Sequence, residues 1–323
     1  MTAPAAERTR ADLDADSLTF EQAAEARVTG QLDVAVSIAN QAIKAQYERL
    51  KAKHGVPLPR REGEALARYA AQLLSGIDPD MQPELAREVQ RGLRMGADQA
   101  REISGERTRG NRLADRDLRR VTRQVDQRAR AALDDAVAYA QTGPLSRMED
   151  VQVVMNAAQR AATRARADVR WATNRAINAG ASAVADAQGR HLVWIAERDA
   201  CLHCLAYSGV VTAAGELFPE GLTFAASSGL PAVPYPPLHP NCRCRVEPFN
   251  DDVGTDTGLQ REARRAVLRG DSAYASERER LSAADRLLRR GAGLPRTVEE
   301  RARRAVRAGR FETEAERTAR RRS

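Results

Sequence analysis

Apolar residues recur at intervals of three and four positions along most of the chain, which is the pattern of an amphipathic α-helix. The first such stretch covers 18–53 and ends before Gly55 and two prolines, which are helix-stop signals. Shorter stretches at 62–74 and from Pro83 onward show the same spacing. The N-terminal part of the chain is therefore predicted to be a series of helices.

Two longer helices are predicted next, over 106–141 and 147–188. The Thr-Gly-Pro segment 142–144 separates them, and so short a break places consecutive helices side by side in opposite directions. Ser146 and Glu149 match the capping-box pattern at the start of the second helix. The sequence thus predicts an antiparallel helical hairpin.

The composition changes abruptly at Gly189. The apolar run 191–196 is the one clear strand pattern in the chain, and helical spacing then stops over 197–249. We predict a compact module here that is built mainly from turns. The aromatic residues expected in its small core are Trp194, Phe218, Phe224, Tyr235 and Phe249.

Short, highly charged helices are predicted after this module, at 260–269, 278–290 and 298–308. Thr297 and Glu300 match a second capping box. Because these segments contain few large apolar residues, we expect them to need a docking partner to stay ordered.

The predicted fold is mainly α. N-terminal helices and a long helical hairpin are followed by a small α+β cysteine-rich module and a basic helical tail. The changes in composition divide the chain into a helical N-terminal region over 1–145, a second region over 146–250 that contains the module, and a charged tail over 251–323.

The positive charge of the chain is concentrated in this tail. The whole sequence has 52 Lys and Arg against 44 Asp and Glu, and residues 251–323 alone contain 19 basic and 13 acidic residues. Such a cluster can displace the counterions of double-stranded DNA. A second cluster at 101–130 has acids interleaved throughout, which favours a solvated helix face instead. The candidate DNA contacts are Arg301, Arg303, Arg304, Arg307, Arg310, Arg320, Arg321 and Arg322.

No part of the sequence predicts a membrane protein. No run approaches the ~18 uncharged apolar residues that a spanning helix needs. The first residues carry acids and lack the apolar core of a secretory signal, so we expect synthesis in the cytoplasm.

All four cysteines lie within the module, in two groups. Cys201-Leu-His-Cys204 is followed by His239-Pro-Asn-Cys242-Arg-Cys244, and two such groups can supply four ligands to tetrahedral Zn²⁺. A module this small gains folding free energy from a metal ion. Five residues compete for four places, and our first choice is Cys201, Cys204 and His239 with either Cys242 or Cys244. Plain thiols, a disulfide or a redox pair are the alternatives, although the last lacks a thioredoxin-like context.

The same residues resemble the signature of the Mu F-like phage head morphogenesis proteins. The resemblance covers about 150–249 and runs in order through a tryptophan, an aspartate, CxxC, a glycine and P-x-H-P-N-C-R-C. In this sequence the elements are Trp194, Asp199, Cys201 to Cys204, Gly209 and 237–244. The hexad from His239 to Cys244 is its most specific part.

The resemblance implies a minor head protein of a tailed phage, made in the bacterial host cytoplasm and located in the virion, in the capsid interior or at the portal vertex. It implies the portal or the major capsid protein as partners, contact with packaged DNA, and a role in assembly, packaging or ejection. Within the module we expect Trp194, Asp199, Asn241 and Arg243 to give structural support, with Arg243 binding a carboxylate or backbone carbonyls.

The sequence lacks the motifs of the common enzyme classes. It has no HExxH, no GxSxG elbow, no GxxxxGK[ST] loop and no deaminase HxE before its CxxC. Asp199 or Glu197 could act with a metal-bound water only if the metal kept an open position, and four protein ligands leave none. We therefore expect a non-enzymatic assembly protein, with a zinc-stabilised nucleic-acid binder that uses its Arg-rich tail as the alternative.

Overall fold

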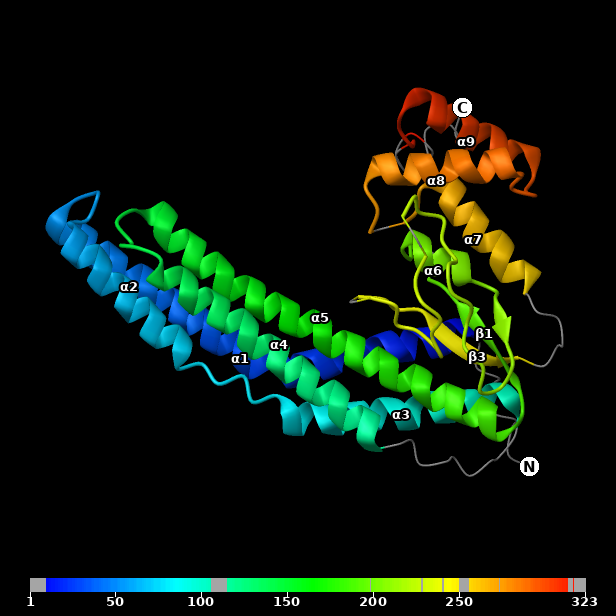
Figure 1. Cartoon of the computed structure of the whole chain (residues 1–323), viewed down its shortest axis with the longest axis horizontal. Helices are drawn as coiled ribbons and strands as arrows, with labels where there is room; N and C mark the ends of the chain where they lie inside the picture. The colour runs from blue at the N-terminus through cyan, green and yellow to red at the C-terminus, as the bar shows by residue number, and fades with distance from the viewer. Residues whose placement is uncertain are drawn as a thin grey trace, which may run out of the picture. The chain divides into compact units, whose positions relative to one another are not determined.

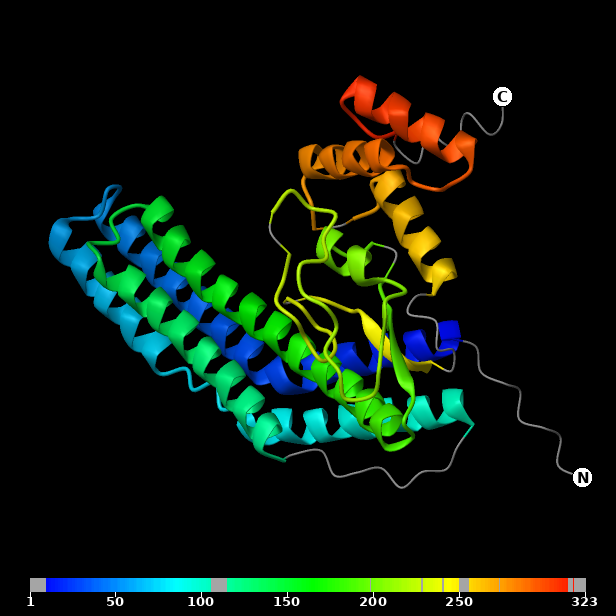
Figure 2. The same cartoon turned by 45° about the vertical axis from the view of Figure 1, so that its right-hand side comes forward.

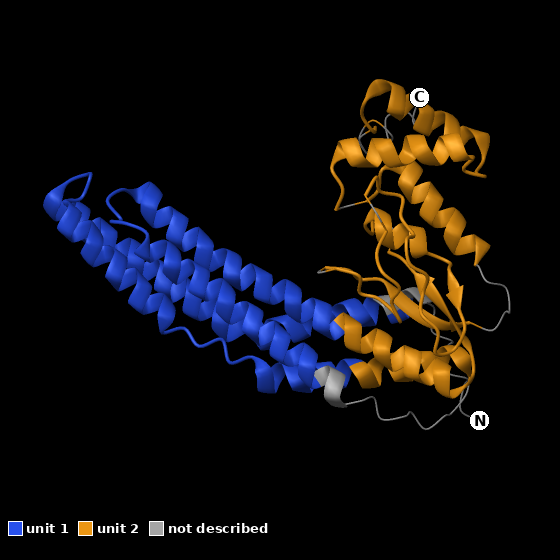
Figure 3. Cartoon of the chain, viewed as in Figure 1, with its two compact units in different colours: residues 1–92, 114–173 blue, residues 93–113, 174–323 orange. Residues whose placement is uncertain are grey.

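The computed structural model describes residues 10–105, 115–197, 199–227, 229–239, 241–249, 256–272, 274–312 and 316. The fold is mainly helical with one small sheet, which confirms the predicted fold class (Figures 1 and 2). Its packing divides into two compact units, 1–92 with 114–173 and 93–113 with 174–323 (Figure 3). The predicted regions 1–145, 146–250 and 251–323 follow composition, so the two divisions have different boundaries.

Unit 1 is all helical. It contains α1 (Arg10–His54), α2 (Arg60–Ser75), the first part of α3 (Gln82–Ser104), α4 (Asp115–Gln141) and the first part of α5 (Met148–Ala187). The apolar stripes seen in the sequence form its core, in which α2 packs against α1 and α4. These helices confirm the predicted ones, and the part of the predicted helix at 106–114 lies outside the described residues.

Helices α4 and α5 form the predicted antiparallel hairpin in unit 1. They lie side by side in both views (Figures 1 and 2), and Arg128 of α4 pairs with Asp168 of α5 at 3.2 Å. The predicted capping box at the start of α5 names the wrong acidic residue. The Asp150 side chain, and not that of Glu149, accepts hydrogen bonds from the backbone N–H groups of Ser146 and Arg147, at 3.1 and 2.9 Å.

Unit 2 contains a three-stranded antiparallel sheet in the order β2-β1-β3. The predicted strand is β1 (His191–Ile195), whereas β2 (Val211–Thr212) and β3 (Arg245–Phe249) were not predicted. The sequence of β3, Arg-Val-Glu-Pro-Phe, has no clear strand pattern because it is short, contains a proline and is charged at Arg245 and Glu247, both of which are buried in the structure. The short helix α6 (Leu202–Tyr207) was also missed, since six residues are too few to show a helical period.

The ends of α3 and α5 that belong to unit 2 cross with their backbones in contact. A Cβ atom on Gly96 would lie 1.8 Å from the carbonyl oxygen of Ile177, and one on Gly180 would lie 2.1 Å from that of Leu93. Only glycine permits this approach without moving a helix backbone. The crossing fixes the C-terminal part of α5, which shares a buried cluster with β1 through Ala181, among other residues.

The chain ends in α7 (Thr257–Arg269), α8 (Glu277–Arg290) and α9 (Arg296–Ala308), which together we call the C-terminal cap. These helices dock within the chain itself and share the core of unit 2, α7 through Leu268, α8 through Leu287 and α9 through Ala302. A capping box does occur in the cap, but at Ser276 and Glu279, before α8.

The capping box predicted at Thr297 and Glu300 is wrong. Helix α9 begins after Pro295, whose side chain makes no capping hydrogen bond, and the Glu300 carboxylate instead pairs with Arg296 at 2.8 Å. Among the described residues, no helix is long and apolar enough to cross a membrane.

Candidate metal centre

The first two sulfurs of the module are positioned by the start of α6. Cys201 is the N-cap residue of this helix, and its sulfur accepts a hydrogen bond from the backbone N–H of Cys204 at 3.4 Å. Cys201 and Cys204 are about one helical turn apart and lie on the same side of the helix start. Their sulfurs are therefore directed toward the same point. This explains why a CxxC spacing is effective even though α6 itself has no periodic signal.

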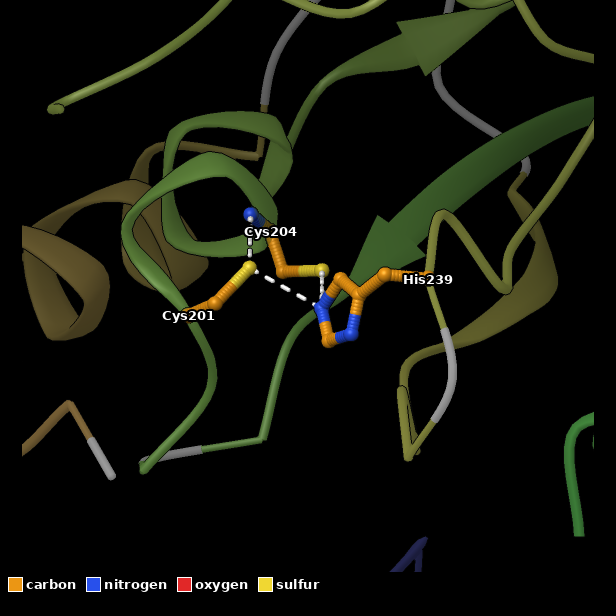
Figure 4. A group of neighbouring side chains, drawn as sticks. All are labelled: Cys201, Cys204 and His239. Atoms are coloured by element: carbon orange, nitrogen blue, oxygen red, sulfur yellow. Dashed lines mark hydrogen bonds between the residues drawn. The ribbon is translucent and has the colours of Figure 1, made fainter. Parts of the chain in front are cut away.

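The loop that precedes β3 brings the other candidates to the same point. The Nε2 atom of His239 lies 3.0 Å from the sulfur of Cys201 and 3.5 Å from that of Cys204 (Figure 4). The sulfur of Cys242 lies 3.6 Å from that of Cys204. Segments separated by more than thirty residues thus converge, and all four cysteines are buried and free of disulfides.

The cluster consists of two overlapping triads that share Cys204. In each triad, Cys201, Cys204 and His239 or Cys204, Cys242 and Cys244, the candidate ligand atoms all lie within 4.8 Å of one another. With Zn–S and Zn–N bonds of about 2.3 and 2.0 Å, a tetrahedral ion needs S···S and S···N separations of about 3.8 and 3.5 Å. The Cys204–Cys242 and Cys204–His239 distances are close to these values, whereas the Cys201–His239 distance of 3.0 Å is shorter. The cluster can therefore hold a metal ion after a small adjustment of its side chains.

The pKa values of the four cysteine thiols are shifted in opposite directions. The pKa of Cys201 is lowered to about 4 because the Cys204 side chain, and then His239, hydrogen-bond to it. Contacts with Cys204 also hold the pKa of Cys242 well below its usual value. The pKa of Cys204 is raised well above the usual value by its contacts with the other three sulfurs and by burial. For Cys244 the contact with Cys204 lowers the pKa, but the contact with Cys242 and burial outweigh it and raise the pKa.

The lowered pKa values of Cys201 and Cys242 favour their thiolate forms, and a thiolate in a buried cluster places negative charge in a region of low dielectric constant. Such charge is costly unless a cation or several hydrogen-bond donors compensate it. A thiophilic metal ion provides this compensation directly, because it binds the thiolate form. The electrostatics of the cluster therefore favour a cation at its centre.

The residues expected to support the module lie around the cluster. Arg243 donates through one Nη atom to both carboxylate oxygens of Asp199, at 2.6 and 2.8 Å, and so links the segments that carry the two groups of cysteines. Asn241 has a positive φ of 65°, which bends the loop between His239 and Cys242. Trp194 is fully buried in the core, against Tyr207 and Phe218 with ring centroids 4.9 and 5.1 Å away.

Asn178 of α5 is a supporting residue that the sequence analysis missed. Its side-chain amide donates to the carbonyl of Cys244 at 3.1 Å and accepts from the backbone N–H of Val246 at 2.8 Å. A second contact, from the same amide to Asn174, orients the side chain. The available signal was a pair of asparagines four residues apart in an otherwise Ala-rich helix, which is an unusual choice for a buried face.

The remaining histidine of the module and the candidate DNA contacts are involved in other interactions. His203, inside the CxxC pair, faces Ser227, with its Nε2 atom 3.4 Å from that hydroxyl. Of the candidate DNA contacts in the cap, Arg303 pairs with Glu299 at 3.6 Å and Arg310 pairs with Glu316 at 2.9 Å. The other three candidates in α9, Arg301, Arg304 and Arg307, are exposed to solvent. Arg320, Arg321 and Arg322 lie outside the described residues.

Comparison of the chain with known proteins identifies no relative. No family model matches the chain, no curated protein matches it, and no solved structure matches it. The resemblance of 150–249 to Mu F-like head proteins therefore rests on the motif residues alone.

Asn178→Ala is predicted to loosen the start of β3. The substitution leaves the buried carbonyl of Cys244 and the N–H of Val246 without their partner, at a cost of about 1–3 kcal/mol for each group. Hydrogen exchange at the Val246 amide should accelerate accordingly. Asn156→Ala, at an exposed position of the same helix, is the control and should leave this amide unchanged. Equal exchange in both variants would contradict the bracing role.

Proposed function

We propose that this protein is a minor head protein of a tailed phage, non-enzymatic, which acts in capsid assembly at the portal vertex and in packaging or ejection of the genome. The observation that carries the proposal is the convergence of the motif. The CxxC pair and its neighbour Asp199 are separated from the hexad, His239 to Cys244, by more than thirty residues, and the two segments meet at one cluster. A chance match of separate motifs has no reason to assemble in this way.

The metal in this proposal is structural zinc, held by Cys201, Cys204, His239 and Cys242. The choice rests on the Cys204–His239 and Cys204–Cys242 separations of 3.5 and 3.6 Å, which are near tetrahedral values, and on the preference of Zn²⁺ for thiolate and imidazole. Cys201 and His239, now 3.0 Å apart, would have to separate slightly to share the ion. Cys244 is the fifth candidate, and its backbone carbonyl accepts a hydrogen bond from Asn178 directly before β3. Four protein ligands leave no position for a reactive water, which is the physical reason to assign a structural role.

Native mass spectrometry with elemental analysis should find one zinc per chain. Substituting Cys201, Cys204 or Cys242 by serine, or His239 by alanine, should lower zinc affinity by more than about 100-fold, the upper range for residues that only support a ligand. Cys244→Ser is the matched control and should keep the metal. Fully folded protein without any metal would remove the zinc assignment, and loss of zinc from Cys244→Ser would change the ligand set.

Association with the portal protein of the same genome tests the head-protein proposal. Wild-type protein should co-purify with the portal or the major capsid protein, and Cys204→Ser should reduce recovery at least about tenfold, since the module loses the free energy that metal binding contributes to its fold. Circular dichroism should show that the helices of unit 1 persist in this variant. Absence of wild-type binding to either partner would contradict the proposal.

A second candidate function is binding of double-stranded DNA by the cap, and a specific observation favours it. Arg301, Arg304 and Arg307 are spaced by three residues along α9 and are exposed, while Ala302 and Ala305 face the core. A helix face with this arrangement can contact phosphates without disturbing its own packing.

We expect weaker DNA binding when three arginines are replaced together, in the variant Arg301→Gln, Arg304→Gln, Arg307→Gln, because phosphate contacts are lost. Each lost contact should also reduce the slope of log K against log salt by about 0.9. A gel-shift titration over several salt concentrations measures this slope. The control removes three exposed arginines of α4 instead, at Arg119, Arg120 and Arg123. Equal losses in both variants would indicate general attraction to charge, and negligible wild-type binding at moderate salt would exclude the DNA function.

A further inference from the structure

The C-terminal cap contacts both segments that supply the candidate metal ligands. On the side of the CxxC pair, α7 packs against α6, and the hydroxyl of Ser208 lies 3.5 Å from the carbonyl of Leu259. The N-cap residue of α7, Asp256, donates its backbone N–H to the carbonyl of Gly209 at 2.6 Å. The C-terminal cap therefore packs directly against α6, the helix that carries Cys204.

On the side of the hexad, the contact is made by Tyr274, which lies between α7 and α8. Its ring centroid is 5.8 Å from that of the His239 imidazole, with an angle of 62° between the planes. Its hydroxyl donates to the carbonyl of Asn241 at 3.3 Å. One side chain of the cap thus touches a candidate ligand and the loop that connects this ligand to Cys242.

Tyr274 is much more exposed to solvent than the core residues of the cap. The residue is 51% exposed, whereas the leucines that hold α7 and α8 in place are buried. A half-exposed aromatic ring contributes little to the core, so its contacts with the ligand loop are its main interactions. An edge-to-face ring contact and a hydrogen bond to a loop carbonyl are also the kinds of contact that orient a histidine ligand.

We propose that Tyr274 is a positioning residue for the metal centre, and that metal binding and docking of the C-terminal cap are thermodynamically linked through it. The inference rests on the metal site of the proposed function. A metal ion joins α6 to the loop of His239, and these are the two segments that the cap binds. Because linkage is reciprocal, a cap that favours the metal-bound arrangement must itself be held more tightly when metal is bound.

Zinc affinity is the first test, measured by competition with a chromophoric chelator on the full chain. Tyr274→Ala should weaken zinc binding about 10- to 100-fold, the range for residues that orient a metal ligand. Tyr274→Phe keeps the ring and loses only the hydrogen bond, so its affinity should lie between those of Tyr274→Ala and the wild type. Tyr139→Ala is the matched control, since Tyr139 is 47% exposed and lies on α4.

Two further measurements separate a positioning role from a merely structural one. In the cobalt-substituted protein, Tyr274→Ala should shift the visible absorption bands, because the imidazole of His239 is no longer oriented by the ring. In hydrogen exchange, removing zinc from the wild type should accelerate exchange in α7 and α8, and this response should be smaller in Tyr274→Ala.

The outcomes distinguish the inference from the function on which it rests. If the wild type binds neither zinc nor cobalt, the metal centre itself is wrong. If zinc binds equally well to the wild type and Tyr274→Ala, with unchanged cobalt bands and no effect of zinc on exchange in the cap, the inference is overturned and the centre stands.

Discussion

The module of unit 2 depends on the contacts of one buried sulfur, that of Cys204. It lies 3.5 Å from the imidazole of His239 and 3.6 Å from the sulfur of Cys242, and it belongs to both triads of candidate ligands. The segments that meet there also share the apolar core of unit 2, which includes Trp194, Tyr207 and Phe218. A metal ion shared by these ligands would supply further folding free energy and remove the cost of buried thiolate charge.

The surrounding contacts show how the candidate ligands are held in place. Asn178 fixes the backbone at Cys244, Arg243 joins the second group to Asp199, and Tyr274 reaches the loop of His239. These contacts come from a long helix, from the segment before α6 and from the C-terminal cap. A site supported from several elements is more rigid than one carried by a single loop.

A module made rigid by a metal ion, as proposed, would lose less conformational entropy on binding a partner, which fits the proposed role in a phage head. The module and the cap also offer separate chemistries. The cluster has its polar atoms directed inward, whereas α9 presents exposed arginines outward. Association with the portal or capsid protein and contact with DNA can therefore be tested by substitutions that do not overlap.

The sequence by itself determined most of the helices, the strand at 191–195 and the five candidate ligands, because periodicity and ligand spacing are local properties of the chain. It did not predict α6, β2, β3, Asn178 or Tyr274, it chose the wrong carboxylate at the start of α5, and it predicted a capping box at the start of α9 that does not form. The physical reason is that a strand with buried charges forms only opposite its partner, and a polar side chain finds its acceptor only after distant segments have met. Tertiary packing alone decided those positions.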